Sequence, residues 1–301
     1  MVNVIEVKRL SLSFQMYDRG FSQRLLKVVS NLNAAVGEGE ILAVAGSSGS
    51  GKSLLAHALL GILPKNARLD GEMRWFGAPL DAALQKRLRG REMALVPQSV
   101  TYLDPLIRVG RQISRDKQTV NELLGRYHLK PEAAGLFPHE LSGGMTRRVM
   151  ISTALARRPK LVIADEPTPG LSPRLAEHAM RHFREIADTG TAVLLITHDI
   201  DLAIRYADRV AVFYAGTAVE TAKASDFADA ALLRHPYSKA LWAAMPQNGF
   251  TAAAGAQPYA GDWPPGCLYA PRCPECTPAC VAALPDTRVV RGGEVSCRHA
   301  R

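Results

Sequence analysis

Residues 46–53, with the sequence GSSGSGKS, have the types and spacing that could do the most specific chemistry. They fit the pattern G-x-x-x-x-G-K-[ST] at every position. Glycines let backbone N–H groups approach phosphate oxygens, Lys52 can reach the β- and γ-phosphates, and the Ser53 hydroxyl can bind Mg²⁺. A buried strand is expected over residues 41–45 and a helix over 54–60, beginning under the phosphates. The sequence therefore predicts a nucleoside triphosphate site formed by Gly46, Ser47, Ser48, Gly49, Ser50, Gly51, Lys52, Ser53 and Leu54.

Two adjacent acids end another apolar run, at residues 161–167 (LVIADEP). A buried strand that ends in acids places their carboxylates at the carboxyl edge of the sheet, beside the phosphate loop. There Asp165 would hold Mg²⁺, directly or through water, and Glu166 would polarise an attacking water. An acidic exit from a strand with no catalytic role is the alternative. The presence of Lys52 upstream favours the catalytic interpretation.

A third motif, LSGGM at residues 141–145, precedes a helix-like segment. Ser142 is expected to cap this helix, and Gly143 and Gly144 would expose N–H groups at its positive end, which binds anions. The same chain already has a phosphate cradle. We therefore expect Ser142, Gly143, Gly144 and Met145 to contact a nucleotide held by a second chain.

The phosphate loop, the LSGG motif and the Asp-Glu strand, in this order, resemble the ATP-binding-cassette (ABC) ATPases. The resemblance implies a P-loop NTPase of the ABC type, an α/β fold with a RecA-like mixed sheet core and an inserted helical subdomain. Independently, strand-like and helix-like segments alternate along most of the chain, which indicates an α/β domain with a largely parallel sheet. We expect an ATPase domain over residues 1–240, with the helical subdomain at about 102–158. A C-terminal extension with a linker and a cysteine cluster would follow over 241–301.

The resemblance extends to single residues. It implies that Gln98, in VPQ, contacts Mg²⁺ and the attacking water, and that His198, in ITHD, contacts the γ-phosphate and holds Glu166 in place. Phe14 resembles the aromatic residue that stacks on adenine; Tyr17 is the less favoured candidate, and a core role for Phe14 stays open. The predicted catalytic residues are thus Glu166, His198 and Gln98, and the predicted Mg²⁺ ligands are Ser53, Gln98 and Asp165.

One position departs from the family pattern. After Glu166 the family usually continues to Leu-Asp, but this chain has Leu171-Ser172. The missing acid normally crosses the dimer to organise the partner's site, so the two ATP sites of the assembled complex are expected to be unequal.

Several segments resemble the ATPases of oligopeptide, dipeptide and nickel importers. They are Met145 in the signature and residues 98–105, 109–110, 137–140, 235–241, 245–246, 264–267 and 270–274. This resemblance implies a heterodimer with a second ABC ATPase, two transmembrane permease subunits and an extracytoplasmic solute-binding protein. Peptides are the expected solute, and nickel or a metal–metallophore complex is the alternative. A non-transport ABC ATPase of a soluble complex, such as phosphonate-cleaving machinery, is the second alternative.

Composition limits the location and the partners. No apolar run approaches the ~18 residues that span a bilayer, and residues 1–8 lack the apolar centre of a signal peptide. We expect a peripheral protein at the cytoplasmic face of the inner membrane. The formal net charge of +9 fits either nucleic acid or an anionic leaflet. The interval between Ser53 and Ser142 is too short for the arms of DNA-acting or ribosome-acting cassettes, so no nucleic-acid partner is expected.

All five cysteines lie in the C-terminal 35 residues, spaced by five, two, three and sixteen residues. A cytosolic location argues against disulfides. A Pro-rich tail of this size buries little apolar surface, so a bound metal would stabilise its fold. The spacing is not that of a zinc ribbon. Cys267, Cys273, Cys280 and Cys297 match the extension of the peptide-importer ATPases, some of which carry a [4Fe-4S] cluster. Zinc and unliganded thiols are the alternatives, with Cys276 extra to the pattern and His299 as a stand-in ligand.

Overall fold

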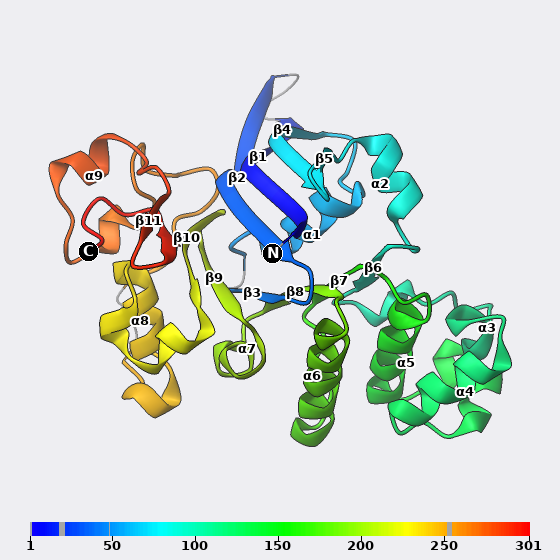
Figure 1. Cartoon of the computed structure of the whole chain (residues 1–301). Helices are drawn as coiled ribbons and strands as arrows, with labels where there is room; N and C mark the ends of the chain where they lie inside the picture. Colours follow the sequence, from blue (N-terminus) through cyan, green and yellow to red (C-terminus); the bar gives the residue numbers. More distant parts are fainter. Residues whose placement is uncertain (1, 18–21, 48, 252–254) are drawn as a thin grey trace.

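The computed structural model describes residues 2–17, 22–47, 49–251 and 255–301, whose strands form two sheets (Figure 1). Over these residues the larger sheet has eight strands in the order β11-β12-β10-β9-β3-β8-β7-β6. They are β3 (Ile41–Gly46), β6 (Met93–Val96), β7 (Leu161–Asp165), β8 (Ala192–Thr197), β9 (Arg209–Tyr214), β10 (Thr217–Lys223), β11 (Arg288–Val290) and β12 (Gly293–Val295). The run from β9 to β6 is parallel, whereas β10, β11 and β12 pair antiparallel. The predicted α/β fold with a mixed sheet is confirmed.

The parallel strands are buried on both faces, which explains their unbroken apolar sequences. On β3, Leu42 and Val44 belong to one core together with α1 (Lys52–Leu60). The alternate residues Ala43 and Ala45 belong to a second core, with α6 (Pro173–Asp188). Because successive side chains point to opposite faces, one short strand supports helices on both sides.

The smaller sheet is antiparallel, in the order β2-β1-β4-β5, and lies above the larger sheet in Figure 1. Its strands are β1 (Asn3–Tyr17), β2 (Gln23–Gly37), β4 (Ala67–Trp75) and β5 (Ala78–Pro79). The sheet shares the core that contains α1, so it covers the helix that follows the phosphate loop.

Helices fill the chain between β6 and β7, where the sequence predicts the inserted helical subdomain. They are the short 3-10 helix Val100–Tyr102, α3 (Val109–Ile113), α4 (Lys117–Arg126), the 3-10 helices Pro131–Gly135 and Pro138–Glu140, and α5 (Gly143–Leu155). They have a core of their own, which includes Val109, Leu124 and Val149. In Figure 1 they stand apart from the sheets, at the lower right.

The remaining α-helices are α2 (Ala82–Leu88), α7 (Ile200–Tyr206), α8 (Pro236–Ala243) and α9 (Pro278–Ala282). Further 3-10 helices cover Ala224–Ala228, Ala230–Leu232, Pro246–Asn248 and Ala270–Arg272. In the described ranges, no helix combines the length and apolar character needed to cross a membrane.

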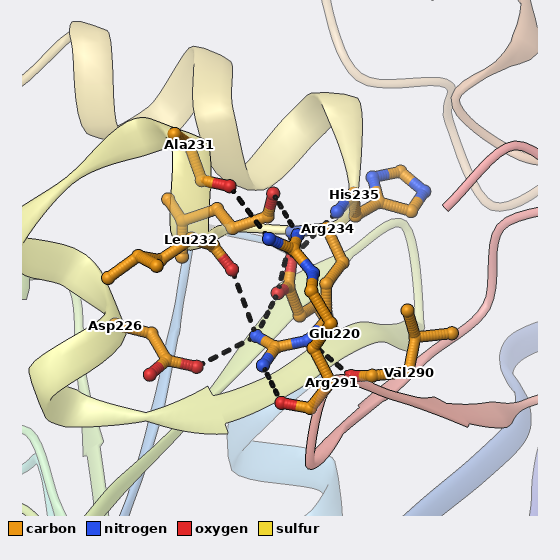
Figure 2. Close-up of polar contacts among 9 residues, drawn as sticks. Glu220, Asp226, Ala231, Leu232, Arg234, His235, Val290 and Arg291 are labelled. Atoms are coloured by element: carbon orange, nitrogen blue, oxygen red, sulfur yellow. Dashed lines mark hydrogen bonds and ion pairs between the residues drawn. The ribbon is translucent and has the colours of Figure 1, made fainter. Parts of the chain in front are cut away.

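The C-terminal extension joins the main sheet. β12 pairs with β10, with Val295 opposite Glu220. The β11–β12 turn is held by Arg234, whose guanidinium donates to the carbonyls of Val290 and Arg291 (Figure 2). The predicted domain boundary at residue 240 falls inside α8, and the division into domains stays a prediction.

Candidate functional site

The predicted phosphate loop connects β3 to α1, at the carboxyl edge of the parallel strands, where α/β sheets bind ligands. A Cβ on Gly46 would overlap the carbonyl oxygen of Phe213 on the neighbouring strand β9. Gly51, just before α1, has a φ of 93°, which favours glycine. Ser48 lies outside the described residues. Two of the motif's glycines are therefore demanded by the backbone geometry itself.

Lys52 lies folded against the loop. Its Nζ donates to the carbonyl oxygens of Gly46 and Ser47, each at 2.8 Å. Burial lowers the pKa of Lys52, and the negative charges of Glu166 and Asp165 oppose this shift. A buried cation with few fixed partners is suited to bind phosphate oxygens at this end of the loop.

Ser53, in the first turn of α1, contacts Asp165, the last residue of β7. The Ser53 hydroxyl donates to Asp165 Oδ1 at 3.1 Å. Burial raises the pKa of Asp165, and the hydrogen bond from Ser53 opposes the rise. A hydroxyl beside a carboxylate is an oxygen donor set of the kind that Mg²⁺ prefers, so the residues present fit that ion.

Glu166 and His198 also come together, from the ends of β7 and β8. His198 Nδ1 lies 2.9 Å from both carboxylate oxygens of Glu166. Glu166 is buried, whereas the His198 side chain is 67% exposed. Glu166 has a φ of 48°, a strained conformation for a residue with a Cβ, and strain of this kind gathers at functional sites. In this arrangement His198 can fix the orientation of the Glu166 carboxylate, so that the carboxylate can face an attacking water.

These residues surround a cavity of about 550 Å³. Its walls include the loop residues from Gly49 to Leu54 together with Gln98, Glu166 and His198. Among the described residues that line it, Phe14 does not occur. The Phe14 ring packs instead against the core of the smaller sheet. Its stacking role stays a prediction, as do the roles of the other site residues.

Arg147, on α5, is a residue that motif matching missed. Its Nη1 and Nη2 donate to the carbonyl oxygens of Pro97 and Gln98, both at 2.6 Å. The side chain is 5% exposed, and burial lowers its pKa while Asp165 and Glu166 oppose the shift. Arg147 therefore ties the helix of the LSGGM motif to the backbone that carries Gln98. The only signal in the sequence was an arginine two residues after Met145.

The LSGGM motif begins α5, as predicted from its capping pattern. Ser142 Oγ accepts a hydrogen bond from the Met145 backbone N–H at 3.4 Å. Within the described part of the cavity wall, neither Ser142, Gly143, Gly144 nor Met145 occurs. The motif's predicted role toward a second chain is compatible with this position and stays a prediction.

A second group that motif matching missed comes from the C-terminal extension. Gln257, Pro258, Ala260 and Trp263 line the same cavity, and Ser47 Oγ donates to Gln257 Oε1 at 2.7 Å. No local pattern marks them, because their place depends on how the extension folds back over some 200 residues of chain.

The five cysteines of the extension differ in exposure, and the predicted cluster stays a prediction. Cys280 and Cys297 are buried, Cys267 and Cys273 half-buried, and Cys276 exposed. Burial is the main cause that raises the pKa of Cys267 and of Cys297, and that of Cys273 to about 11. Cys280 Sγ lies 3.3 Å from His299 Nε2. Across the described residues, no group of three or more His, Cys, Asp or Glu side chains is arranged to hold a metal ion.

Comparison with known proteins decides the family. Residues 29–169 match the family described as ABC transporter, and residues 219–280 match the oligopeptide/dipeptide transporter C-terminal region. A putative peptide import ATP-binding protein of Brucella abortus is 35% identical over 98% of this chain and 94% of the relative. The dipeptide transport ATP-binding protein DppD of Escherichia coli is 34% identical over 98% and 96%. The chain belongs to the ATP-binding subunits of ABC transporters.

Solved structures agree with this assignment. A dimeric ATP-binding cassette in a post-hydrolysis state with ADP and Pi has a TM-score of 0.65 and 25% identity, and the match covers 73% of this chain and 98% of that one. The family couples ATP hydrolysis to transport, ATP and Mg²⁺ are the cofactors that it implies, and membrane permeases are the partners that it implies.

Proposed function

We propose that this ABC ATPase powers the import of dipeptides or oligopeptides across the cytoplasmic membrane, from its cytoplasmic face. The observation that carries the proposal is the match to peptide import and dipeptide transport ATP-binding proteins over 98% of the chain. The extension supports it, because residues 219–280 match a region characteristic of oligopeptide and dipeptide transporters.

In the proposed site, the loop N–H groups and Lys52 bind the β- and γ-phosphates. Ser53, Asp165 and Gln98 hold Mg²⁺, which when bound would neutralise charge on the phosphate oxygens. The direct hydrogen bond between Ser53 and Asp165 supports this Mg²⁺ site, because it shows that two of the proposed ligands lie next to each other.

Glu166 orients and polarises the attacking water, and His198 holds the carboxylate in place through Nδ1. The support is the 2.9 Å separation between this nitrogen and both carboxylate oxygens. The chain's contribution is then charge stabilisation and positioning of water rather than covalent chemistry.

A second ABC ATPase completes the site. We propose a heterodimer in which Ser142, Gly143, Gly144 and Met145 of one chain contact the ATP of the other. The dimeric relative supports the arrangement. Ser172 stands at the start of α6 with no capping hydrogen bond from its side chain, where the family pattern has an acid. The proposed inequality of the two ATP sites predicts that Ser172→Asp changes the ATPase rate; an unchanged rate in the assembled complex would count against it.

The two permease subunits are proposed to dock beside the segment that follows Gln98. Leu106 is 85% exposed and Tyr102 59% exposed, so this segment has apolar side chains at its surface. Next to them is a cavity of about 860 Å³ between the main sheet and the helical subdomain, lined by Leu95, Leu103 and Met150 among others. An exposed apolar edge beside a cavity is the kind of surface that receives a partner helix. A solute-binding protein would act through the permeases.

A [4Fe-4S] cluster on Cys267, Cys273, Cys280 and Cys297, with zinc as the alternative, also stays a proposal. Its support is that these four thiols gather in the extension. They would have to move closer together, because they are not arranged as a metal site. Anaerobic purification followed by iron, sulfide and zinc analysis tests it: a colourless, metal-free and fully folded extension would remove the cluster.

Uptake by a deletion strain tests the transport function. Import of a labelled dipeptide should be lost, restored by the native gene, and not restored by Glu166→Gln, whose product should bind ATP and remain in the closed dimer. Loss of nickel uptake with normal peptide uptake would support the metal-importer alternative. Purification with soluble enzyme subunits and without permeases in detergent would support the soluble-complex alternative.

A further inference from the structure

One wall of the ATP cavity comes from a part of the chain far from every nucleotide motif. Residues 255–263 lead from the ATPase toward the cysteines, and Gln257, Pro258, Ala260 and Trp263 line the cavity together with Lys52 and Glu166. In Figure 1 the orange trace of the extension passes beside β2. A Cβ built on Gly261 would lie 3.6 Å from Leu26 of that strand, which agrees with this path.

Trp263 is packed against a turn that is bonded to the phosphate loop. A Cβ on Gly216, between β9 and β10, would meet two carbons of the Trp263 ring at 2.9 Å. The Gly216 N–H donates to the Ser50 carbonyl oxygen at 2.9 Å. At the other end of the segment, Gln257 accepts the hydrogen bond from Ser47. The segment therefore contacts the loop directly through Gln257 and indirectly, through the Gly216 turn, by way of Trp263.

Two kinds of residue line the cavity. Polar and charged side chains suited to phosphates and Mg²⁺ are those of Lys52, Ser53, Gln98, Glu166 and His198. Apolar side chains without charge are those of Val28, Leu54, Ala215 and Trp263. Since ATP joins a triphosphate to an apolar base, its nucleoside half fits the apolar lining residues. Phe14 is not among the lining residues.

The Trp263 indole Nε1–H is itself buried and, within the described part of the chain, has no hydrogen-bond partner. The surface that Trp263 offers to the cavity is therefore apolar.

We propose that residues 257–263 form a wall of the ATP site, against which the nucleoside half of ATP packs, with Trp263 as its central contact. Trp263 supplies the apolar ring surface, and Gln257 holds the segment on the loop. The proposal rests on ATP occupying this cavity, which the proposed function also requires, and it is independent of the transported solute.

Calorimetric titration of the full-length chain tests the wall. In a Glu166→Gln background, which prevents turnover, Trp263→Ala should weaken Mg-ATP and Mg-ADP binding about tenfold, while tripolyphosphate binding changes by less than about twofold. Trp263→Phe should give an intermediate loss. The matched control is Trp242→Phe: the Trp242 indole donates to the Phe227 carbonyl oxygen, away from the cavity, so nucleotide binding should not change.

Unchanged or tighter nucleotide binding by Trp263→Ala would overturn the proposal, and tighter binding would show that the segment competes with ATP. Equal weakening of tripolyphosphate would overturn the assignment to the nucleoside half. If the Glu166→Gln parent itself binds no nucleotide, the ATP site is wrong, and this failure is separate from that of the wall.

Fluorescence gives a second readout that needs no change at Trp263. With Trp75→Phe and Trp242→Phe, Trp263 is the remaining tryptophan. Its emission should change on titration with Mg-ADP and saturate at the dissociation constant measured by calorimetry. Gln257→Ala, which removes a half-buried side chain and leaves the core intact, should weaken nucleotide binding by about threefold. Constant emission together with unchanged binding by Gln257→Ala would overturn the proposal even if Trp263→Ala did not fold.

Discussion

Arg234→Met should loosen the C-terminal extension from the ATPase. In Figure 2 the Arg234 guanidinium donates to the Glu220 and Asp226 carboxylates and to the carbonyl oxygens of Leu232, Val290 and Arg291. The side chains of Arg234 and Glu220 are 3% and 0% exposed. Methionine matches the length of the stem but can make none of these hydrogen bonds.

The size of the effect follows from what stays buried. Removing one partner of a buried ion pair destabilises a protein by about 3–5 kcal/mol, because the other charge is left without compensation. Glu220 would still accept hydrogen bonds from the backbone N–H groups of Arg234 and His235. We therefore expect the lower end, about 3 kcal/mol, and a melting temperature lower by about 6 °C in a chain of this size.

The assay is urea unfolding combined with hydrogen exchange over β11 and β12. Arg291→Met is the matched control, since this arginine lies in the same turn and donates from its exposed side chain to the Ala231 and Leu233 carbonyl oxygens. The control should lose less than about 1 kcal/mol. If Arg234→Met lost no more stability than the control, and exchange over β12 did not accelerate, the buried network would not hold the extension.

Three further predictions concern the site and its support. Gly46→Ala should destabilise the chain by about 1–3 kcal/mol in thermal unfolding, because its Cβ overlaps the Phe213 carbonyl oxygen, whereas Gly49→Ala, with no atom near its Cβ, should lose only about 1 kcal/mol. Arg147→Met should lower the ATPase rate at least about tenfold with little change in Mg-ATP affinity. The reason is that the backbone carrying Gln98 loses two charge-assisted hydrogen bonds. A loss of Mg-ATP affinity without a lower rate would contradict this prediction. His182 is buried against Tyr127, and burial lowers the pKa of His182 to about 4. As the pH falls, the histidine is therefore protonated in the unfolded state before it is protonated in the folded state. The free energy of unfolding should fall by up to about 3 kcal/mol between pH 6.5 and pH 4. His182→Asn should flatten that part of the stability curve in urea titrations at stepped pH, and a curve as steep as the native one would refute the assignment.

The phosphate-binding half of the site could be predicted from the sequence because its residues are neighbours along the chain or end adjacent strands. Gly46 and Lys52 share one loop, and its pattern specifies the turn. Asp165 and His198 follow buried strands whose carboxyl ends meet at one edge of the sheet. Because these strands are adjacent in the sheet, residues of separate motifs lie close together. The structure shows this as the contacts of Ser53 with Asp165 and of Glu166 with His198.

Other features depend on tertiary packing that no local pattern encodes. The burial of Arg147 against the Gln98 backbone requires the helical subdomain to dock on the main sheet. For Phe14, the resemblance to the family suggested a contact with adenine, which stays a prediction. The Phe14 side chain is half-buried against the core of the smaller sheet, where the register of β1 with its neighbours places it.

The extension, which the sequence predicts over residues 241–301, makes contacts with both the main sheet and the phosphate loop. It adds β12 to the main sheet beside β10, and β10 follows the turn that carries Gly216. That turn is bonded to the phosphate loop through Ser50 and is covered by Trp263. A displacement of the extension should therefore move either the sheet edge or the loop, because β12 pairs with β10 and Gln257 accepts a hydrogen bond from Ser47. Loosening the anchor with Arg234→Met should then weaken Mg-ADP binding as well as stability, and unaltered nucleotide affinity in a measurably loosened extension would show that the two attachments act independently.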